Sequence, residues 1–418
     1  MPQHTGTPSA AYTGTPAAAH TAIPSTARRI TSIDALRGLV MIIMALDHVR
    51  DFIHRGAMSG SPADLATTTP LLFFTRWITH ICAPVFMLTA GMGAYLWWQR
   101  GRSRRELSWF LLTRGVWLIV LEITVMRLAY NFSFSGQYPL LLIVLWALGA
   151  CMIAMAALVW LPLPALATVS LAAIAGHNLL DGIAPARLGA LAGAWTVLHQ
   201  PGVVPFPGMV VFVAYPLVPW VAVMALGFCL GPAYRWEAPR RERLLLTAGL
   251  AATAAFVVLR GLDGYGDPAP WTAQRSAVYT LLSFFNTTKY PPSLVFLLMT
   301  LGPALLLLAW LDRRVIGPSN PLVVFGRVPL FYFVLHFFLA HLAVLALSLL
   351  EYGRAAWGFG LNPVPSMGGP KELFPPAFGW SLGAVYLMWA VVVVALYPVC
   401  RWFAAVKARR RDWWLGYL

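Results

Sequence analysis

Charged side chains are scarce in this chain of 418 residues: 11% are Asp, Glu, Lys or Arg, while 59% are hydrophobic. Soluble domains carry about 25% charged residues, so too few are present here to cover a water-soluble surface of this size. Many apolar runs are long enough to cross about 30 Å of hydrocarbon. These features exclude a soluble enzyme, a coiled coil and a disordered protein. They predict an all-α polytopic membrane protein.

Negative charge is scarcer still, with 15 Asp and Glu against 30 Lys and Arg and a net charge of +15. In a soluble protein this excess would suggest nucleic acid as a partner. In a membrane protein, basic residues instead collect in cytoplasmic loops and contact anionic lipid head groups. We therefore expect the lipid bilayer, and no nucleic acid, as a partner.

Motifs for several kinds of chemistry are missing. No GxSxG, Walker A, HExxH or GxGxxG context is present, so serine hydrolysis, P-loop ATP use and zinc proteolysis have no support. The four cysteines form no CxxC pair and are best explained as small core residues. The histidine spacings match no usual ligand pattern, so we expect no metal. Residues 1–28 lack the features of a signal peptide and are predicted to form a disordered tail.

The apolar runs divide the chain into ten predicted membrane spans, separated by short basic or polar stretches. Their approximate ranges are 33–53, 71–98, 107–126, 139–161, 163–180, 206–231, 244–261, 291–311, 321–350 and 378–402. If the N-terminus is cytoplasmic, every dense basic cluster falls on the cytoplasmic side. These clusters are 28–29, 100–105, 235–243, 313–314 and 401–411. Because basic residues favour cytoplasmic loops, we predict that both termini lie inside.

Ionisable residues within the spans mark the candidate site, since such groups are costly in a bilayer. The densest group is at the outer end of the first span. At 3.6 residues per turn, Asp47, Asp51 and His54 share one helix face, while His48 lies about 100° away from Asp47. The second span adds Arg76 and His80, an i,i+4 pair predicted to lie on one face.

Two further spans carry ionisable residues at middle to outer depth, Glu122 in the third and His336 in the ninth. A histidine oriented by a carboxylate can act as a base or a nucleophile near neutral pH. The same set of residues would serve as a proton relay in a transporter. Any single member could also be part of a structural ion pair, so these alternatives stay open.

One known family resembles this sequence. The opening at 29–38 (RITSIDALRG), leading into 44–48 (MALDH), is similar to that of the heparan-α-glucosaminide N-acetyltransferase-like family. The similarity continues through most of the chain. Its further segments are 75–80 (TRWITH), 83–86 (APVF), 286–293 (NTTKYPPS) and 326–332 (GRVPLFY), followed by His336.

The resemblance implies transfer of an acetyl group from cytosolic acetyl-CoA to an amino sugar on the opposite side of the membrane. It also implies an essential histidine in the first stretch after span one, the region of His54, with His48 as a rival. Asp47 stands near the family's Asn. The luminal domain that precedes span one in the eukaryotic enzyme is absent from this sequence, so we do not expect heparan sulfate as the acceptor.

Together these observations predict a multi-pass acyltransferase of a bacterial inner membrane, with acetyl-CoA as donor and a glycan or lipid-linked sugar as acceptor. Residues 29–403 would form the membrane domain and 404–418 a basic cytoplasmic tail. The expected catalytic residues are His54, His48, Asp47, Asp51 and His80. The residues expected to bind CoA phosphates are Arg37, Arg114 and Arg327, and those expected to bind the acceptor are Arg76, Glu122 and His336. A proton-coupled transporter of small solutes is the alternative function, and a homodimer is an open alternative for the assembly.

Overall fold

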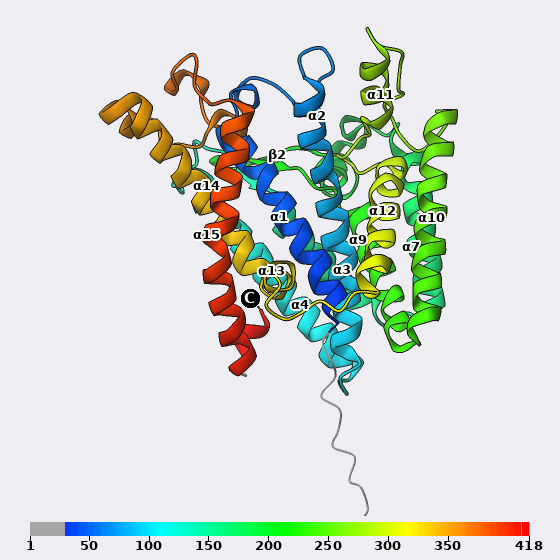
Figure 1. Ribbon diagram of the computed structural model, residues 1–418. Coiled ribbons are helices and arrows are strands. Elements are labelled where there is room, and N and C mark those ends of the chain that lie inside the picture. The colour runs from blue at the N-terminus through cyan, green and yellow to red at the C-terminus, as the bar shows by residue number, and fades with distance from the viewer. Residues whose placement is uncertain (1–29, 411, 418) are drawn as a thin grey trace, which may run out of the picture. The chain divides into compact units, whose positions relative to one another are not determined.

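Helices make up most of the computed structural model, which describes residues 30–410 and 412–417 (Figure 1). The described residues from Thr31 onward belong to one compact unit. The predicted tail at 1–28 lies outside the described residues. Within the described part of the chain, eight helical stretches are long and apolar enough to cross a membrane. The predicted all-α polytopic membrane fold is therefore confirmed.

Each of the ten predicted spans contains at least one helix. The first five contain α1 (Thr31–Ile53), α2 (Pro70–Trp77) with α3 (Cys82–Trp98), α4 (Arg104–Leu121) with α5 (Arg127–Asn131), α6 (Val144–Leu158) and α7 (Leu163–Gly176). The last five contain α9 (Leu217–Leu230), α10 (Ala238–Leu262), α12 (Leu294–Asp312), α13 (Pro321–Arg327) with α14 (Pro329–Tyr352), and α15 (Leu382–Arg409). The shorter helix α8 (Ala192–Leu198) lies in the connection between spans five and six, and α11 (Ala277–Phe285) lies in the connection between spans seven and eight.

Two predicted spans begin too early, because apolar strands precede their helices. Strand β1 (Leu140–Leu142) lies before α6, and strands β2 (Gly202–Phe206) and β3 (Met209–Val213) lie before α9. They form one small sheet in the order β1-β3-β2, with β3 parallel to β1 and antiparallel to β2. Hydropathy alone does not distinguish a short apolar strand from a buried helix, so the predicted spans included residues of these strands together with the helices that follow them.

Two other predicted boundaries also differ from the structure. The ninth span is two helices, broken at Val328, whose backbone leaves the helical region (φ −131°, ψ 49°). Val328 precedes Pro329, and the residue before a proline is disfavoured in the α conformation. The expected start of the tail at 404 falls inside α15, which continues to Arg409.

Helix α1 lies among the other helices, and most of its residues are buried (Figure 1). It packs closely on α13, because Gly38 meets the backbone of Leu322 and Gly326 meets the backbone of Asp34. A Cβ atom at either glycine would collide with a main-chain carbonyl. This enclosure lets α1 carry charged residues that would be costly if they faced lipid.

Three of the basic clusters lie at the end of the unit where α1 begins. Arg241 pairs with Asp312 at 2.5 Å, and Ser32 donates to the same carboxylate at 2.8 Å. Arg235 donates to the Gln99 side chain at 2.9 Å. The loops that carry the clusters at 100–105, 235–243 and 313–314 therefore lie close to the start of α1. That this end faces the cytoplasm stays a prediction.

Candidate active site

A cavity of about 590 Å³ lies between α1, α2, the three-stranded sheet and the loop that precedes α12. Side chains of β1, β2 and β3 form part of its apolar wall. Its lining also brings together charged and imidazole groups that are far apart in the sequence. They are Asp47, His48, Asp51, Arg76 and Lys289. We call this space the outer cavity, because it lies toward the end of α1 that carries Ile53.

Four charged residues beside the outer cavity form an ion-pair network. Asp47 lies at its centre, with its Oδ1 atom 2.9 Å from Nη2 of Arg50, and Arg76 from α2 donates to its Oδ2 atom. Arg50 also pairs with Asp51. The two carboxylates and two guanidinium groups balance in charge. The three-residue spacing of Asp47 and Arg50 places them one helical turn apart, as helical geometry requires.

Two histidines 288 residues apart meet at the cavity: Nδ1 of His48 lies 2.6 Å from Nε2 of His336. Nδ1 of His336 in turn lies 3.1 Å from the main-chain oxygen of Tyr332. A carbonyl oxygen can only accept, so Nδ1 of a neutral His336 carries the proton and its Nε2 atom accepts one. His48 must then donate from Nδ1, which leaves Nε2 of His48 with a free lone pair.

That second nitrogen of His48 is available for chemistry. Among the described residues, no hydrogen-bond partner is found for Nε2 of His48. The side chain lines the outer cavity and is only partly buried. An unprotonated imidazole nitrogen that reaches a cavity can accept a proton or an acyl group from a ligand there. His336 is not a lining residue, and it holds His48 from behind.

The structure places His54 away from the outer cavity. Helix α1 ends at Ile53, and the main-chain nitrogen of His54 still donates to the Arg50 oxygen at 2.9 Å, so the chain leaves the helix only after this residue (φ −71°, ψ 127°). It lines a separate cavity of about 290 Å³, apart from Asp47 and Asp51. Burial, together with the charges of Arg50 and Arg55, lowers the pKa of His54. Among the described residues, no carboxylate is hydrogen-bonded to His54.

Arg76 and His80 do not share a face as predicted. Residues Ile78–Ile81 form a 3₁₀ segment, in which three residues make a turn, so positions four apart diverge. Arg76 reaches Asp47 at the outer cavity. His80 is buried against Phe296, with 5.4 Å between the ring centroids, and is not a lining residue.

Glu122 has a structural position rather than a place at the outer cavity. Its Oε2 atom accepts from the main-chain nitrogens of Leu145 and Trp146 at 2.8 and 3.1 Å, and Tyr130 donates to Oε1 at 3.1 Å. These main-chain groups belong to the first turn of α6, where they have no partner within the helix. The carboxylate therefore caps α6 from a neighbouring helix, and the prediction that it binds an acceptor is not supported by its position.

A second cavity, of about 270 Å³, lies nearer the start of α1, and we call it the inner cavity. Arg37 and Arg114 line it, whereas Arg327 does not. Arg37 donates to the main-chain oxygen of Thr89, and Arg114 donates to that of Gly416. The two cavities share three lining residues, Phe86, Val144 and Phe333. The two cavities therefore adjoin.

Lys289 and Tyr290 are lining residues that the residue-by-residue reasoning missed. The signal was present, because both fall in the polar segment 286–293 that carries part of the family resemblance. Because both residues lie in a loop, the sequence did not indicate that they line the cavity. Among the described residues, no group of three or more His, Cys, Asp or Glu side chains is arranged to hold a metal ion.

These features define a class: a polytopic membrane protein with a histidine pair, one member buried and the other lining a cavity between its helices. A family model described as heparan-alpha-glucosaminide N-acetyltransferase, catalytic, matches residues 29–261, more than half of the chain. The chain belongs to this family, and it is a membrane acetyltransferase. A comparison with curated proteins finds no match.

Proposed function

We propose that this protein moves an acetyl group from cytosolic acetyl-CoA to an amine or hydroxyl of a glycan or lipid-linked sugar on the periplasmic side of a bacterial inner membrane. The observation that carries the proposal is the pair of adjoining cavities, which share Phe86, Val144 and Phe333. One is lined by arginines near the basic end of the unit, and the other contains the partly exposed His48. Transfer of an acetyl group from one side of the membrane to the other requires such an arrangement of a donor site next to an acceptor site.

The inner cavity fits the donor by its residue chemistry. CoA supplies a thioester-activated acetyl group on a polyanionic carrier. Arg37 and Arg114 line the inner cavity, and guanidinium groups suit phosphate oxygens because several N–H donors lie in one plane. The remaining lining is mostly apolar, which suits an uncharged pantetheine arm. Arg327 lies away from this lining, so we do not assign it to the donor.

At the outer cavity, His48 performs the proton transfer. In one route, Nε2 takes the proton from the attacking amine or hydroxyl as the bond to the acetyl carbon forms and the C–S bond breaks, and CoA leaves as its thiol after taking up that proton. In the other route, Nε2 attacks the thioester and CoA leaves, and the acceptor then displaces the acetyl group from Nε2 and gives its proton to the imidazole. His336 fixes the ring through the 2.6 Å hydrogen bond to Nδ1. Asp47 stabilises the positive charge that His48 gains, and its own pairing with Arg76 keeps it in place.

The experiment that tests this function uses purified protein in nanodiscs with acetyl-labelled CoA and glucosamine. We expect release of the CoA thiol together with labelled N-acetylglucosamine. The His48→Ala variant should bind CoA and release little thiol. A protein that releases no thiol under any condition, yet carries protons across a liposome membrane, would be a transporter and would contradict the proposal.

The orientation is part of the proposal and has its own test. A cysteine at Ser59, in the first outer loop, should react with an impermeant maleimide in intact cells. A cysteine at Ser103, the residue that caps the start of α4, should react only after the cells are opened. The reverse pattern would place the His48 side of the protein in the cytoplasm and overturn the direction of transfer.

A further inference from the structure

Lys289 contributes a positive charge to the outer cavity that no carboxylate there balances. The two acidic lining residues, Asp47 and Asp51, are already paired with Arg50 and Arg76. Within the described residues, the ammonium group of Lys289 has no ion pair. It approaches the ring of Tyr290, at 5.2 Å from the centroid, and the carboxylate whose charge reaches it, Asp47, is already shared by two arginines. A cation without a partner in a mostly apolar cavity is costly unless a ligand brings the opposite charge.

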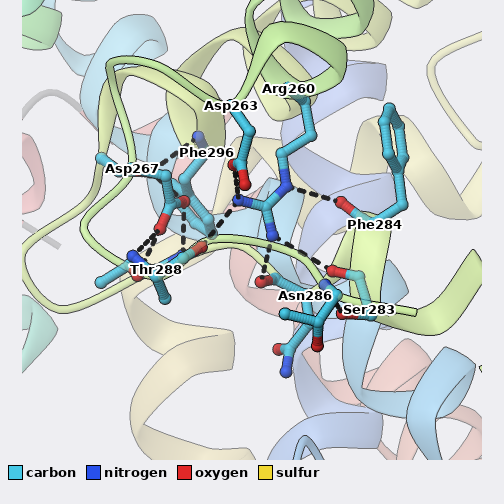
Figure 2. Close-up of polar contacts among 11 residues, drawn as sticks. Arg260, Asp263, Asp267, Ser283, Phe284, Asn286, Thr288 and Phe296 are labelled. Atoms are coloured by element: carbon cyan, nitrogen blue, oxygen red, sulfur yellow. Dashed lines mark hydrogen bonds and ion pairs between the residues drawn. The ribbon is translucent and has the colours of Figure 1, made fainter. Parts of the chain in front are cut away.

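The segment on the N-terminal side of Lys289 is firmly held, as Figure 2 shows. The guanidinium group of Arg260, fully buried in α10, donates to the main-chain oxygens of Phe284, Ser283 and Asn286 at 2.9, 3.1 and 3.1 Å. It also donates to the oxygen of Ala269 at 2.8 Å. One side chain thus joins α10 to the end of α11 and to the loop that carries Lys289.

Asp267 holds the residues on either side of Lys289 (Figure 2). Its carboxylate accepts from the main-chain nitrogen and the hydroxyl of Thr288 at 2.9 and 2.7 Å, and from the hydroxyl of Ser293 at 2.8 Å. Ser293 in turn donates from its main-chain nitrogen to the Thr288 oxygen at 3.0 Å. The backbone that carries Lys289 is therefore already fixed, so a ligand would not have to order this loop on binding.

Tyr290 reports the positive field at this point. Burial raises the pKa of its phenol, whereas the charges of Lys289 and Arg76 and a hydrogen bond with Tyr215 lower it, and together these hold the pKa below its ordinary value. The ring packs edge-on against Tyr215, another lining residue, at 5.3 Å between centroids. The part of the cavity wall formed by Lys289, Tyr290 and Tyr215 is thus both aromatic and positive, a combination that suits a sugar ring bearing an anionic group.

From this geometry we infer that Lys289 binds a negatively charged substituent of the acceptor, and that the acceptor is a phosphorylated amino sugar. This rests on the proposed function, whose site it deepens. An ammonium group is a compact point charge with three donors, which suits a phosphate monoester or diester. The phosphate belongs either to a soluble sugar phosphate or to the link between a sugar and a lipid, and the chemistry at Lys289 is the same for both.

The test compares acceptors that differ in charge. Protein in nanodiscs receives acetyl-CoA with glucosamine, with glucosamine 6-phosphate, or with glucosamine joined through a phosphate to a polyprenyl chain. The last two distinguish a soluble from a lipid-linked source. We expect a higher kcat/KM for a phosphorylated acceptor than for glucosamine. In Lys289→Gln the ratio of these two values should fall about 10- to 100-fold, as expected for the loss of a hydrogen bond to a charged group.

Two further variants separate charge from folding. Lys289→Arg keeps the charge and should keep most of the preference, whereas Lys371→Gln removes the same charge from an exposed lysine and should leave the ratio unchanged. Binding of glucosamine 6-phosphate in the absence of donor, measured by calorimetry, should weaken in Lys289→Gln by a similar factor. Thermal unfolding of each variant in the same nanodiscs shows whether it is folded.

The outcomes are distinguishable from those of the proposed function. If wild-type protein shows no preference for a phosphorylated acceptor, or if Lys289→Gln changes neither the preference nor the calorimetric affinity, the inference is overturned. If the sugar phosphate binds through Lys289 but no acetyl group is transferred to any acceptor, the inference holds and the acetyl-transfer proposal fails.

Discussion

Replacing Asp47 with Asn should strongly destabilise the protein, because one buried carboxylate serves two arginines. The Asp47 side chain is 10% exposed and the Arg76 side chain 16%. Asn has nearly the same shape, so the substitution removes the charge and leaves no void. Arg50 keeps Asp51 as a partner, and Arg76 loses its only carboxylate among the described residues. Breaking one buried pair in this way costs about 3–5 kcal/mol.

The free energy of unfolding can be measured by SDS titration of the detergent-solubilised protein, followed by far-UV circular dichroism. Glu372→Gln is the matched control, since it neutralises an exposed carboxylate, and it should change stability by less than about 0.5 kcal/mol. An Asp47→Asn variant as stable as this control would refute the reasoning.

A double-mutant cycle sharpens the test of the pair. Arg76→Gln should cost several kcal/mol in the wild-type background but much less in the Asp47→Asn background, since no unpaired charge is then created. If the two losses simply add, Asp47 and Arg76 do not form the ion pair that the structure shows.

Two more predictions concern packing and donor binding. Gly38→Ala should destabilise the protein by about 1–3 kcal/mol, because its Cβ would strike the backbone of α13. Gly60→Ala, where nothing lies within 4 Å of the new atom, should have little effect in the same SDS titration. Equal stability of the two variants would contradict the close packing of α1 on α13. Arg114→Ala should weaken CoA binding about tenfold or more in calorimetry, as expected for a charge-assisted contact with phosphate. Arg327→Ala changes a residue outside the inner cavity and should leave CoA binding unchanged. If Arg327→Ala weakened CoA binding and Arg114→Ala did not, the donor site would have to lie elsewhere.

Much of the fold could be predicted from the sequence, because the bilayer imposes a strong and simple pattern. Every predicted span contains a helix, and the ionisable residues of α1 do lie beside a cavity. Asp47 and Arg50, three residues apart, form an ion pair within α1. Local rules suffice there, since helical geometry fixes which neighbours meet along one helix.

The rest depended on where helices stop and on contacts between distant segments. The sequence did not show that His54 lines a separate cavity, because this depends on how the loop that follows α1 packs. The pairing of His48 with His336 spans 288 residues and requires the packing of α14 against α1, which no local pattern encodes. Glu122 was predicted to be a functional carboxylate because its partners, the main-chain N–H groups of α6 and the Tyr130 hydroxyl, cannot be recognised from the sequence.

The most direct test of the central claim is acetyl transfer by His48→Ala and His54→Ala measured side by side in nanodiscs. Both variants are first shown to bind CoA and to unfold at a temperature near that of the wild type. We predict that His48→Ala loses about 10²–10⁴-fold in kcat, the cost of losing a general base, while His54→Ala stays close to wild type. Near-normal transfer by His48→Ala, with loss of transfer in His54→Ala, would contradict the account.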